Sequence, residues 1–213
     1  MTDAAGNSAN ASVSLNVVDS TAPSIVSTPG TITISLSASC QAAVPNVLSG
    51  IVATDNCTPA TQLGMTQDPA AGTIVGTGQH TIAVTVSDAA GNSANANVLL
   101  KVLDSAPPSI QSVTASPNVL SPPNHQMVPV NLTVVASDDC DIAPVSKIIS
   151  VTCNESSAPA DLQLTGNLTL NLAASRNPGG PGRIYAVTVE CRDASGNAST
   201  RSVTVTVPKG NGK

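Results

Sequence analysis

Hydrophobic and polar residues alternate along most of this chain of 213 residues. Valine, isoleucine and leucine occupy every second position of many segments, and serine, threonine and asparagine stand between them. A period of two is typical of strands that pack one face and expose the other. The alternation predicts strands over residues 31–37, 80–86, 128–134, 162–164, 168–172 and 202–207.

The segments between these strands predict a sandwich or a barrel. The chain contains 15 Gly and 16 Pro, and Asn and Asp join them at the strand ends. Short strands separated by such turn residues at about 8–12-residue spacing indicate an all-β sandwich or barrel. Phe and Trp are absent and there is one Tyr, so we expect a core of small aliphatic side chains.

A repeat sets the organisation of the chain. Residues 2–25 and 87–110 are identical at 17 of 24 positions, and a third copy of the motif D-A-x-G-N follows Arg192. A second motif, A-T-D-N-C at Ala53–Cys57, corresponds to A-S-D-D-C at Ala136–Cys140. Such self-similarity indicates tandem modules.

The repeat divides the chain into three parts. We expect residues 1–20 to be the C-terminal strand of a truncated preceding module, 21–105 to be one module, and 106–213 to be a second, C-terminal module. The predicted strand over 11–18 would then leave an unpaired edge.

Charge and composition exclude two classes of partner. Charged residues make up 10% of the chain, Lys and Arg together number 8, and the net charge is −5. Without basic patches or aromatic platforms we expect no nucleic acid partner. No run of about 20 apolar residues occurs, so we expect no membrane insertion.

Motifs of catalysis are also missing, and we expect that the chain is not an enzyme. It contains no G-x-S-x-G elbow, H-E-x-x-H motif or phosphate-binding loop. Paired carboxylates that hydrolyse glycosides normally come with aromatic sugar platforms, which this sequence lacks. We expect the two histidines to have structural roles: His80 as a solvated residue at the start of a strand, and His125 packed against proline in a proline-rich segment.

The motifs resemble a known family. D-N-C at 55–57, D-A-A-G-N at 88–92 and V-L-D-S-A-P-P at 102–108 look like the hyalin-repeat (HYR) domain and its bacterial immunoglobulin-like relatives. The last module, with residues 121–129 and 154–182, is similar to the C-terminal immunoglobulin-like module of many exported bacterial proteins. The resemblance implies an all-β fold of tandem immunoglobulin-like β-sandwich modules, and it fixes no ligand or activity.

Acidic residues fall where loops of such a sandwich meet. Strands B and F end at the pole at which strand A begins, so the B–C loop, the F–G loop and the incoming linker converge there. The first set contains Asp19, Asp55, Asn56, Asp88 and Asn92, and the second contains Asp104, Asp138, Asp139, Asp193 and Asn197.

Clustered carboxylates favour a bound cation. Ca²⁺ accepts six to eight oxygen ligands from Asp, Asn and backbone carbonyls in flexible geometry, and the resemblance to adhesin repeats implies calcium at module junctions. The alternative is that these residues are ordinary turn formers that cap their own backbone. Both interpretations stay open at the level of sequence.

Five cysteines predict disulfides with one thiol left over. Alternation places Cys140 and Cys191 on the inward faces of parallel strands B and F, and we expect a bond between them. Cys40 and Cys57 are the only pair in their module, which favours a bond if the strand between them bends; the alternative is two free thiols. Cys153 is then the unpaired cysteine.

These observations predict a non-catalytic extracellular module, a stalk or spacer of a secreted or cell-surface bacterial protein, rigidified by Ca²⁺ at module junctions. The expected partners are neighbouring immunoglobulin-like modules of the same chain, with surface protein or glycan ligands also open. Two alternatives remain. One is a ligand-binding accessory module of a secreted enzyme, and the other is a filament subunit that assembles by donating the strand 11–18.

Overall fold

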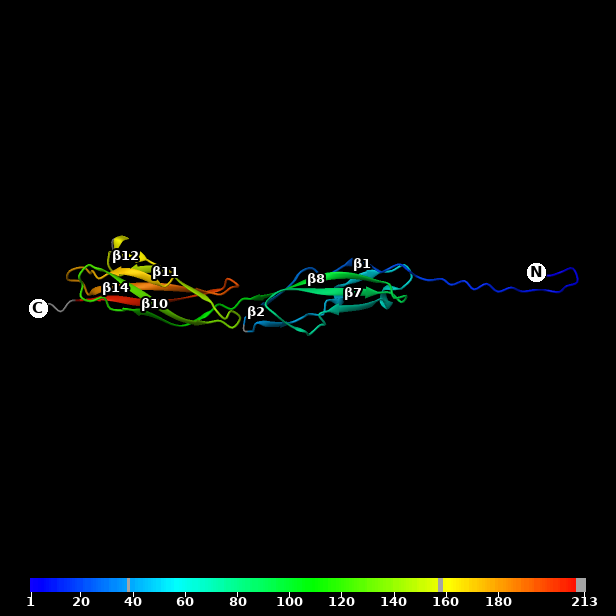
Figure 1. Cartoon of the computed structure of the whole chain (residues 1–213), viewed down its shortest axis with the longest axis horizontal. Coiled ribbons are helices and arrows are strands. Elements are labelled where there is room, and N and C mark those ends of the chain that lie inside the picture. Colours follow the sequence, from blue (N-terminus) through cyan, green and yellow to red (C-terminus); the bar gives the residue numbers. More distant parts are fainter. Residues whose placement is uncertain (38, 157–158, 210–213) are drawn as a thin grey trace. The chain divides into compact units, whose positions relative to one another are not determined.

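The computed structural model describes residues 1–37, 39–156 and 159–209, which form strands and three short 3₁₀ helices (Figure 1). Contacts between residues divide the chain into two compact units. The first contains Met1–Ile32, Ala43–Val75 and Gln79–Lys101, and the second contains Thr33–Ala42, Gly76–Gly78 and the chain from Val102 onward. Among the described residues, none of the helices has the length and hydrophobicity needed to span a membrane.

The strands of the second unit from Ser109 onward form an immunoglobulin-like β-sandwich. One sheet has the order β12 (Leu162–Leu164), β13 (Thr169–Ala173), β10 (Met127–Ser137) and β9 (Ser109–Ser116). The other has the order β11 (Val145–Cys153), β14 (Gly182–Arg192) and β15 (Ala198–Pro208). This division into four and three antiparallel strands matches the sheets DEBA and CFG of a constant-type immunoglobulin domain. The helix η3 (Pro159–Asp161) precedes β12.

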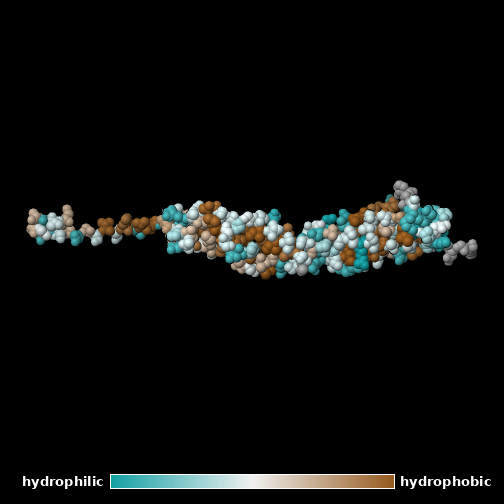
Figure 2. Space-filling model, turned by 180° about the vertical axis from the view of Figure 1, so that it is seen from behind, coloured by the Kyte–Doolittle hydropathy of each residue, from teal (hydrophilic) through white to brown (hydrophobic). Residues whose placement is uncertain are grey.

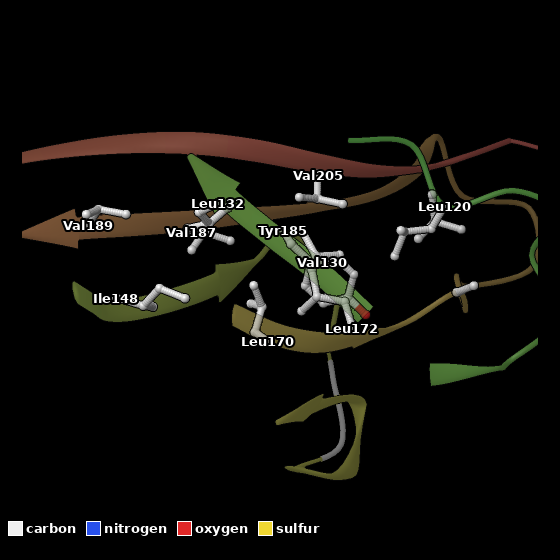
Figure 3. Close-up of a cluster of buried hydrophobic side chains, with 12 residues drawn as sticks. Leu120, Val130, Leu132, Ile148, Leu170, Leu172, Tyr185, Val187, Val189 and Val205 are labelled. Carbon is white, nitrogen blue, oxygen red and sulfur yellow. The ribbon is translucent and has the colours of Figure 1, made fainter. Parts of the chain in front are cut away.

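The core of this sandwich consists of alternate residues from both sheets (Figure 3). Leu170, Leu172 and Val187 are fully buried. Tyr185, the single aromatic residue, is 1% exposed, and its hydroxyl donates a hydrogen bond of 2.9 Å to the carbonyl oxygen of Ala173. The phenol therefore ties the start of β14 to the end of β13, and the rest of the core is aliphatic, as the composition predicts.

The buried guanidinium of Arg183 lies beside the Tyr185 hydroxyl. The guanidinium of Arg183, 4% exposed, donates to Glu155 at 3.2 Å, Asp161 at 2.8 Å and Ser175 at 3.0 Å. It also donates to the Tyr185 hydroxyl at 3.1 Å. Burial of a charge is costly unless it is paired and hydrogen-bonded, and here two carboxylates and two hydroxyls satisfy it.

The strands between Ser24 and Asp104 form one larger and two small sheets. The larger has the order β2 (Ile32–Leu36), β8 (Ser93–Asp104), β7 (Gly78–Ser87) and β5 (Gly64–Asp68). The small sheets pair β1 (Ser24–Ser27) with β4 (Val52–Thr54), and β3 (Gln41–Ala43) with β6 (Ile74–Gly76). The helix η1 (Leu48–Gly50) separates β3 from β4, and η2 (Ala60–Gln62) precedes β5.

The six predicted strands are confirmed as β2, β7, β10, β12, β13 and β15. On β7 the alternation also identifies the inward face, since Ile82, Val84 and Val86 are fully buried. On β10 it places Val130 and Leu132 in the core, where they lie 0% and 6% exposed.

Residues 11–18, expected as the last strand of a truncated module, form no strand within the described chain. Residues 9–23 contain no strand (Figure 1). Val13, Leu15 and Val17 are more than four-fifths exposed, and Figure 2 shows hydrophobic residues along this N-terminal segment. A strand is stable only within a sheet, and none of the described strands pairs with this segment. Its alternation is therefore a strand signal without a partner.

Candidate metal centres

Three copies of the D-A-x-G-N motif fold into the same turn. In each, one oxygen of the Asp carboxylate accepts the backbone N–H of the Asn four residues later, at 2.8, 2.8 and 2.7 Å. The Asn amide donates to the other oxygen at 2.9, 2.7 and 2.8 Å. The glycine before each Asn has a positive φ of 88, 94 and 97°, which glycine adopts without steric cost. The pairs are Asp3–Asn7, Asp88–Asn92 and Asp193–Asn197.

The turns keep their carboxylates ionised. Asp88 and Asp193 are 8% and 6% exposed, and burial alone raises the pKa of each. Hydrogen bonds from Asn92 and Asn197 and from neighbouring backbone N–H groups outweigh burial, so both pKa values lie below the ordinary aspartate value. The turns therefore hold negative charge inside the loops at neutral pH.

Two of the turns also contact the segment that precedes a repeat. The amide of Asn92 donates to the carbonyl oxygen of Asp19 at 3.3 Å, and the amide of Asn197 donates to that of Asp104 at 3.2 Å. Each Asn thus links an F–G loop to an aspartate near the start of strand A, as the topology predicts.

The first centre lies in the first unit and contains Asp19, Asp55 and Asp88. One carboxylate oxygen from each lies within 4.8 Å of the others. Oδ1 of Asp19 accepts the N–H of Thr21 at 3.0 Å, and Oδ1 of Asp55 accepts that of Cys57 at 3.0 Å. The second oxygens, Oδ2 of Asp19 and of Asp55, are buried and have no hydrogen-bond donor.

The second centre lies in the second unit and contains Asp104, Asp138 and the sulfur of Cys140, again within 4.8 Å of one another. Asp104 is 7% exposed; its Oδ1 accepts the N–H of Ala106 at 3.0 Å, and its buried Oδ2 has no donor. Oδ1 of Asp138 accepts the N–H of Cys140 and of Asp141, both at 2.8 Å. The sulfur of Cys140 is bonded to Cys40, so the two carboxylates supply the charge of this centre.

The two predicted sets assemble to different extents. The three aspartates of the first set come together, with Asn92 bonded to two of them, whereas Asn56 is exposed and its amide donates to the sulfur of Cys57. In the second set Asp104 and Asp138 come together.

The other members of the second set lie outside its centre. Among the described residues, Asp193 joins neither group, although Asn197 bonds its carboxylate in the same way as Asn92 bonds that of Asp88. Asp139 is exposed, and Asn197 contacts the centre through the carbonyl of Asp104.

Both predicted disulfides are wrong. The structure joins Cys40 to Cys140, with Cα atoms 5.1 Å apart and 100 residues between them in sequence. Cys57, Cys153 and Cys191 are free, which confirms only Cys153 as an unpaired cysteine.

The error in placing Cys140 has a structural cause. The register shift between β10 and β9 places the extra residue on β9, where Gln111 is skipped, so the alternation of β10 continues unchanged to Ser137. The strand ends at Ser137, so Cys140 lies in the following loop, while Cys191 remains fully buried on β14. The inward faces of β10 and β14 therefore never bring these two sulfurs together.

The sequence contains a signal for the equivalent positions of Cys57 and Cys140, which the disulfide predictions did not use. A-T-D-N-C and A-S-D-D-C place Cys57 and Cys140 at the same position relative to a capping aspartate, and each cysteine lies beside the acidic centre of its own unit.

Comparisons with known proteins give a fold-level likeness. Neither a family model nor a curated protein matches the chain. Among solved structures, the extracellular cadherin domains 1–4 of protocadherin gamma B7 are 17% identical with a TM-score of 0.40. Sidekick-1 immunoglobulin domains 1–5 are 12% identical with a TM-score of 0.45, and fibronectin(III)-like modules of Clostridium thermocellum CbhA are 12% identical with a TM-score of 0.32.

Each of these alignments covers 87% of this chain. The alignments cover 49% of the protocadherin chain, 39% of the Sidekick-1 chain and 94% of the CbhA chain. This protein therefore spans about half the length of the protocadherin structure. The TM-scores of all three lie below 0.5.

Proposed function

We propose that this chain is a non-catalytic extracellular segment, a stalk or spacer of a secreted or cell-surface protein, and that its two acidic centres bind Ca²⁺. This is the role that the resemblance to hyalin-repeat modules implies, with neighbouring immunoglobulin-like modules as partners and a surface protein or glycan as ligand. The observation that supports calcium is the set of buried carboxylate oxygens without a donor, on Asp19, Asp55 and Asp104.

The role of these aspartates as turn formers explains only one of the two oxygens of each carboxylate. In all three, Oδ1 caps backbone N–H groups of the turn that follows. Oδ2 is removed from water and accepts nothing, and leaving a buried charged acceptor unsatisfied costs several kcal/mol or more. A cation between these oxygens removes that cost. Ca²⁺ fits better than Mg²⁺, because Mg²⁺ demands near-ideal octahedral geometry and retains several waters.

The position of the centres suggests a mechanical role. Asp19 precedes β1, and Asp104 ends β8 immediately before the second repeat. The other ligands lie in loops that follow β4, β7 and β10. An ion bound by the aspartate of the incoming segment and by the aspartates of the loops would fix that segment to the sandwich. Removal of the ion would release the segment. A spacer built this way is stiff in calcium and flexible without it.

The test compares aspartate-to-asparagine variants by calorimetric titration with Ca²⁺ and by thermal unfolding in calcium or in chelator. Asp55→Asn and Asp104→Asn keep an oxygen for the turn but remove the charge of the unsatisfied one. Asp3→Asn is the matched control, because Asp3 forms the same kind of turn, is exposed and belongs to neither centre.

We expect the wild type and Asp3→Asn to gain about 2.7 kcal/mol at 100 times the dissociation constant, a rise of several degrees in melting temperature. Each centre variant should lose one of two binding events. Equal melting temperatures of the wild type in both buffers, with no heat of binding, would overturn the calcium proposal.

A further inference from the structure

Cys57 and Cys140 occupy equivalent turns. Oδ1 of Asp55 accepts the N–H of Cys57 at 3.0 Å and of the next residue at 2.8 Å, and Oδ1 of Asp138 accepts the two corresponding N–H groups at 2.8 Å each. The two cysteine backbones are therefore held in the same way, two residues after a capping aspartate.

The two turns also belong to equivalent acidic centres. The sulfur of Cys140 lies within 4.8 Å of carboxylate oxygens of Asp104 and Asp138. Cys57 stands two residues after Asp55 of the first centre and is capped by it, as Cys140 stands two residues after Asp138 of the second and is capped by it. The two cysteines differ in one respect: Cys140 is bonded to Cys40, and Cys57 is a free, exposed thiol.

The repeat shows where a partner for Cys57 would stand. Asp19 is the counterpart of Asp104, because residues 2–25 repeat residues 87–110. Cys140 stands 36 residues after Asp104 and Cys57 stands 38 after Asp19. Cys40 stands 64 residues before Asp104. The equivalent partner of Cys57 would stand 64 residues before Asp19, in a copy of the repeat whose last residues are 8–19.

We infer that Cys57 forms a disulfide from repeat to repeat, and that its partner is the cysteine at the Cys40 position of a preceding copy of the repeat 21–105. The bond follows the pattern of Cys40–Cys140, which joins a residue of repeat 21–105 to a residue of repeat 106–213 and lies within the second compact unit. This inference does not depend on calcium binding. It gives an array of such repeats one covalent bond for each junction.

The chemistry is thiol–disulfide exchange. One cysteine thiolate attacks a small disulfide such as oxidised glutathione, and one glutathione thiolate leaves. The second cysteine thiolate then attacks the mixed disulfide and releases the other glutathione. The two cysteines lose two protons and two electrons, and the small disulfide takes them up as two thiols.

The experiment inserts a second copy of residues 21–105 before residue 21. Because residues 104–105 and 19–20 are both Asp-Ser, the new junction reproduces the natural sequence D-S-T-A-P. The protein is oxidised with oxidised and reduced glutathione and digested without reduction, and its disulfide peptides are mapped. Free thiols are counted in denaturant.

We expect Cys40 of the first copy joined to Cys57 of the second copy, and Cys40 of the second copy joined to Cys140. Three thiols should remain free, as in the parent chain, although the duplicated chain has two more cysteines. Cys57→Ser in the second copy should raise the count to four. The matched change in the first copy should lower it to two and leave both bonds in place.

Five free thiols, or a Cys57 of the second copy joined to any other cysteine, would overturn the inference. Absence of the bond to Cys140 in the duplicated chain would also contradict it, since both junctions rest on the same repeat geometry.

Discussion

At the scale of single residues, the two oxygens of an aspartate carboxylate do different things. Oδ1 of Asp19, Asp55 and Asp104 accepts backbone N–H groups, as expected of a turn former. Oδ2 of the same three residues is buried without a donor. The turn-former and metal-ligand interpretations therefore concern different atoms of the same side chain, and the sequence could not separate them because it identifies residues but not atoms.

The aspartates of the D-A-x-G-N turns predict a pH dependence. The pKa of Asp193 is lowered in the folded chain, so its carboxylate contributes stability that is present above its unfolded pKa of about 3.9. This contribution is lost as the pH falls through the lower folded value. Asp193→Asn removes the ionisable group, while its side-chain oxygen can still accept the N–H of Asn197.

We therefore expect Asp193→Asn to be less stable than the wild type at pH 7, with the difference shrinking as the pH falls below about 4. Urea unfolding in chelator at a series of pH values measures this. A difference that stays constant across the series would show that the charge of Asp193 contributes nothing.

At the scale of elements, the strands could be predicted because their signal is local. Period-two alternation needs only the residues of one segment, and it identified β7 and β15 without knowledge of their partners. Register and pairing need the neighbouring strand. The alternation placed Cys140 on the inward face of β10, but β10 ends at Ser137 and Cys140 lies in the following loop. Residues 11–18 alternate as a strand does but pair with no described strand.

The hydrogen bonds of Arg183 could not be predicted from one segment either, because they join the start of β14 to Glu155 and Asp161 in the segment before β12. Arg183→Met should destabilise the second unit by about 3 kcal/mol, because removing one partner leaves buried carboxylate charge uncompensated. Chemical denaturation followed by circular dichroism measures the change.

The matched control is Arg192→Met on the same strand. The Arg192 side chain is 49% exposed and pairs with Glu190 at 3.1 Å, and exposed pairs contribute about 0–1 kcal/mol. Equal effects at the two positions would mean that the Arg183 network contributes no more than a surface ion pair.

At the scale of the whole molecule, the acidic sets could be predicted in part and the disulfide could not. Topology requires the B–C loop, the F–G loop and the incoming segment to share a pole, which brought Asp19, Asp55 and Asp88 together. A bond between Cys40 and Cys140 depends on how segments 100 residues apart fold back on each other. No local pattern contains that information: counting cysteines led to the wrong pair Cys40–Cys57, and alternation led to the wrong pair Cys140–Cys191.

The length of the loop that this bond closes predicts its contribution to stability. A cross-link that closes about 100 residues restricts the unfolded chain by up to about 4.7 kcal/mol in the chain-entropy model, and measured values are typically about 2–4 kcal/mol. Cys140→Ser should lower the free energy of unfolding of the second unit by about 2–4 kcal/mol, while the cap from Asp138 still holds the turn.

Cys57→Ser is the control for this variant, because it replaces an exposed free thiol after the same aspartate turn, and its effect should stay within about 0.5 kcal/mol. A thiol reductant should lower the stability of the wild type and of Cys57→Ser but leave Cys140→Ser unchanged, since that variant has no bond left to reduce. If the wild type and Cys140→Ser unfold at the same urea concentration without reductant, the Cys40–Cys140 bond does not stabilise the fold. The repeat-to-repeat bond inferred for Cys57 would then join modules without adding to their stability.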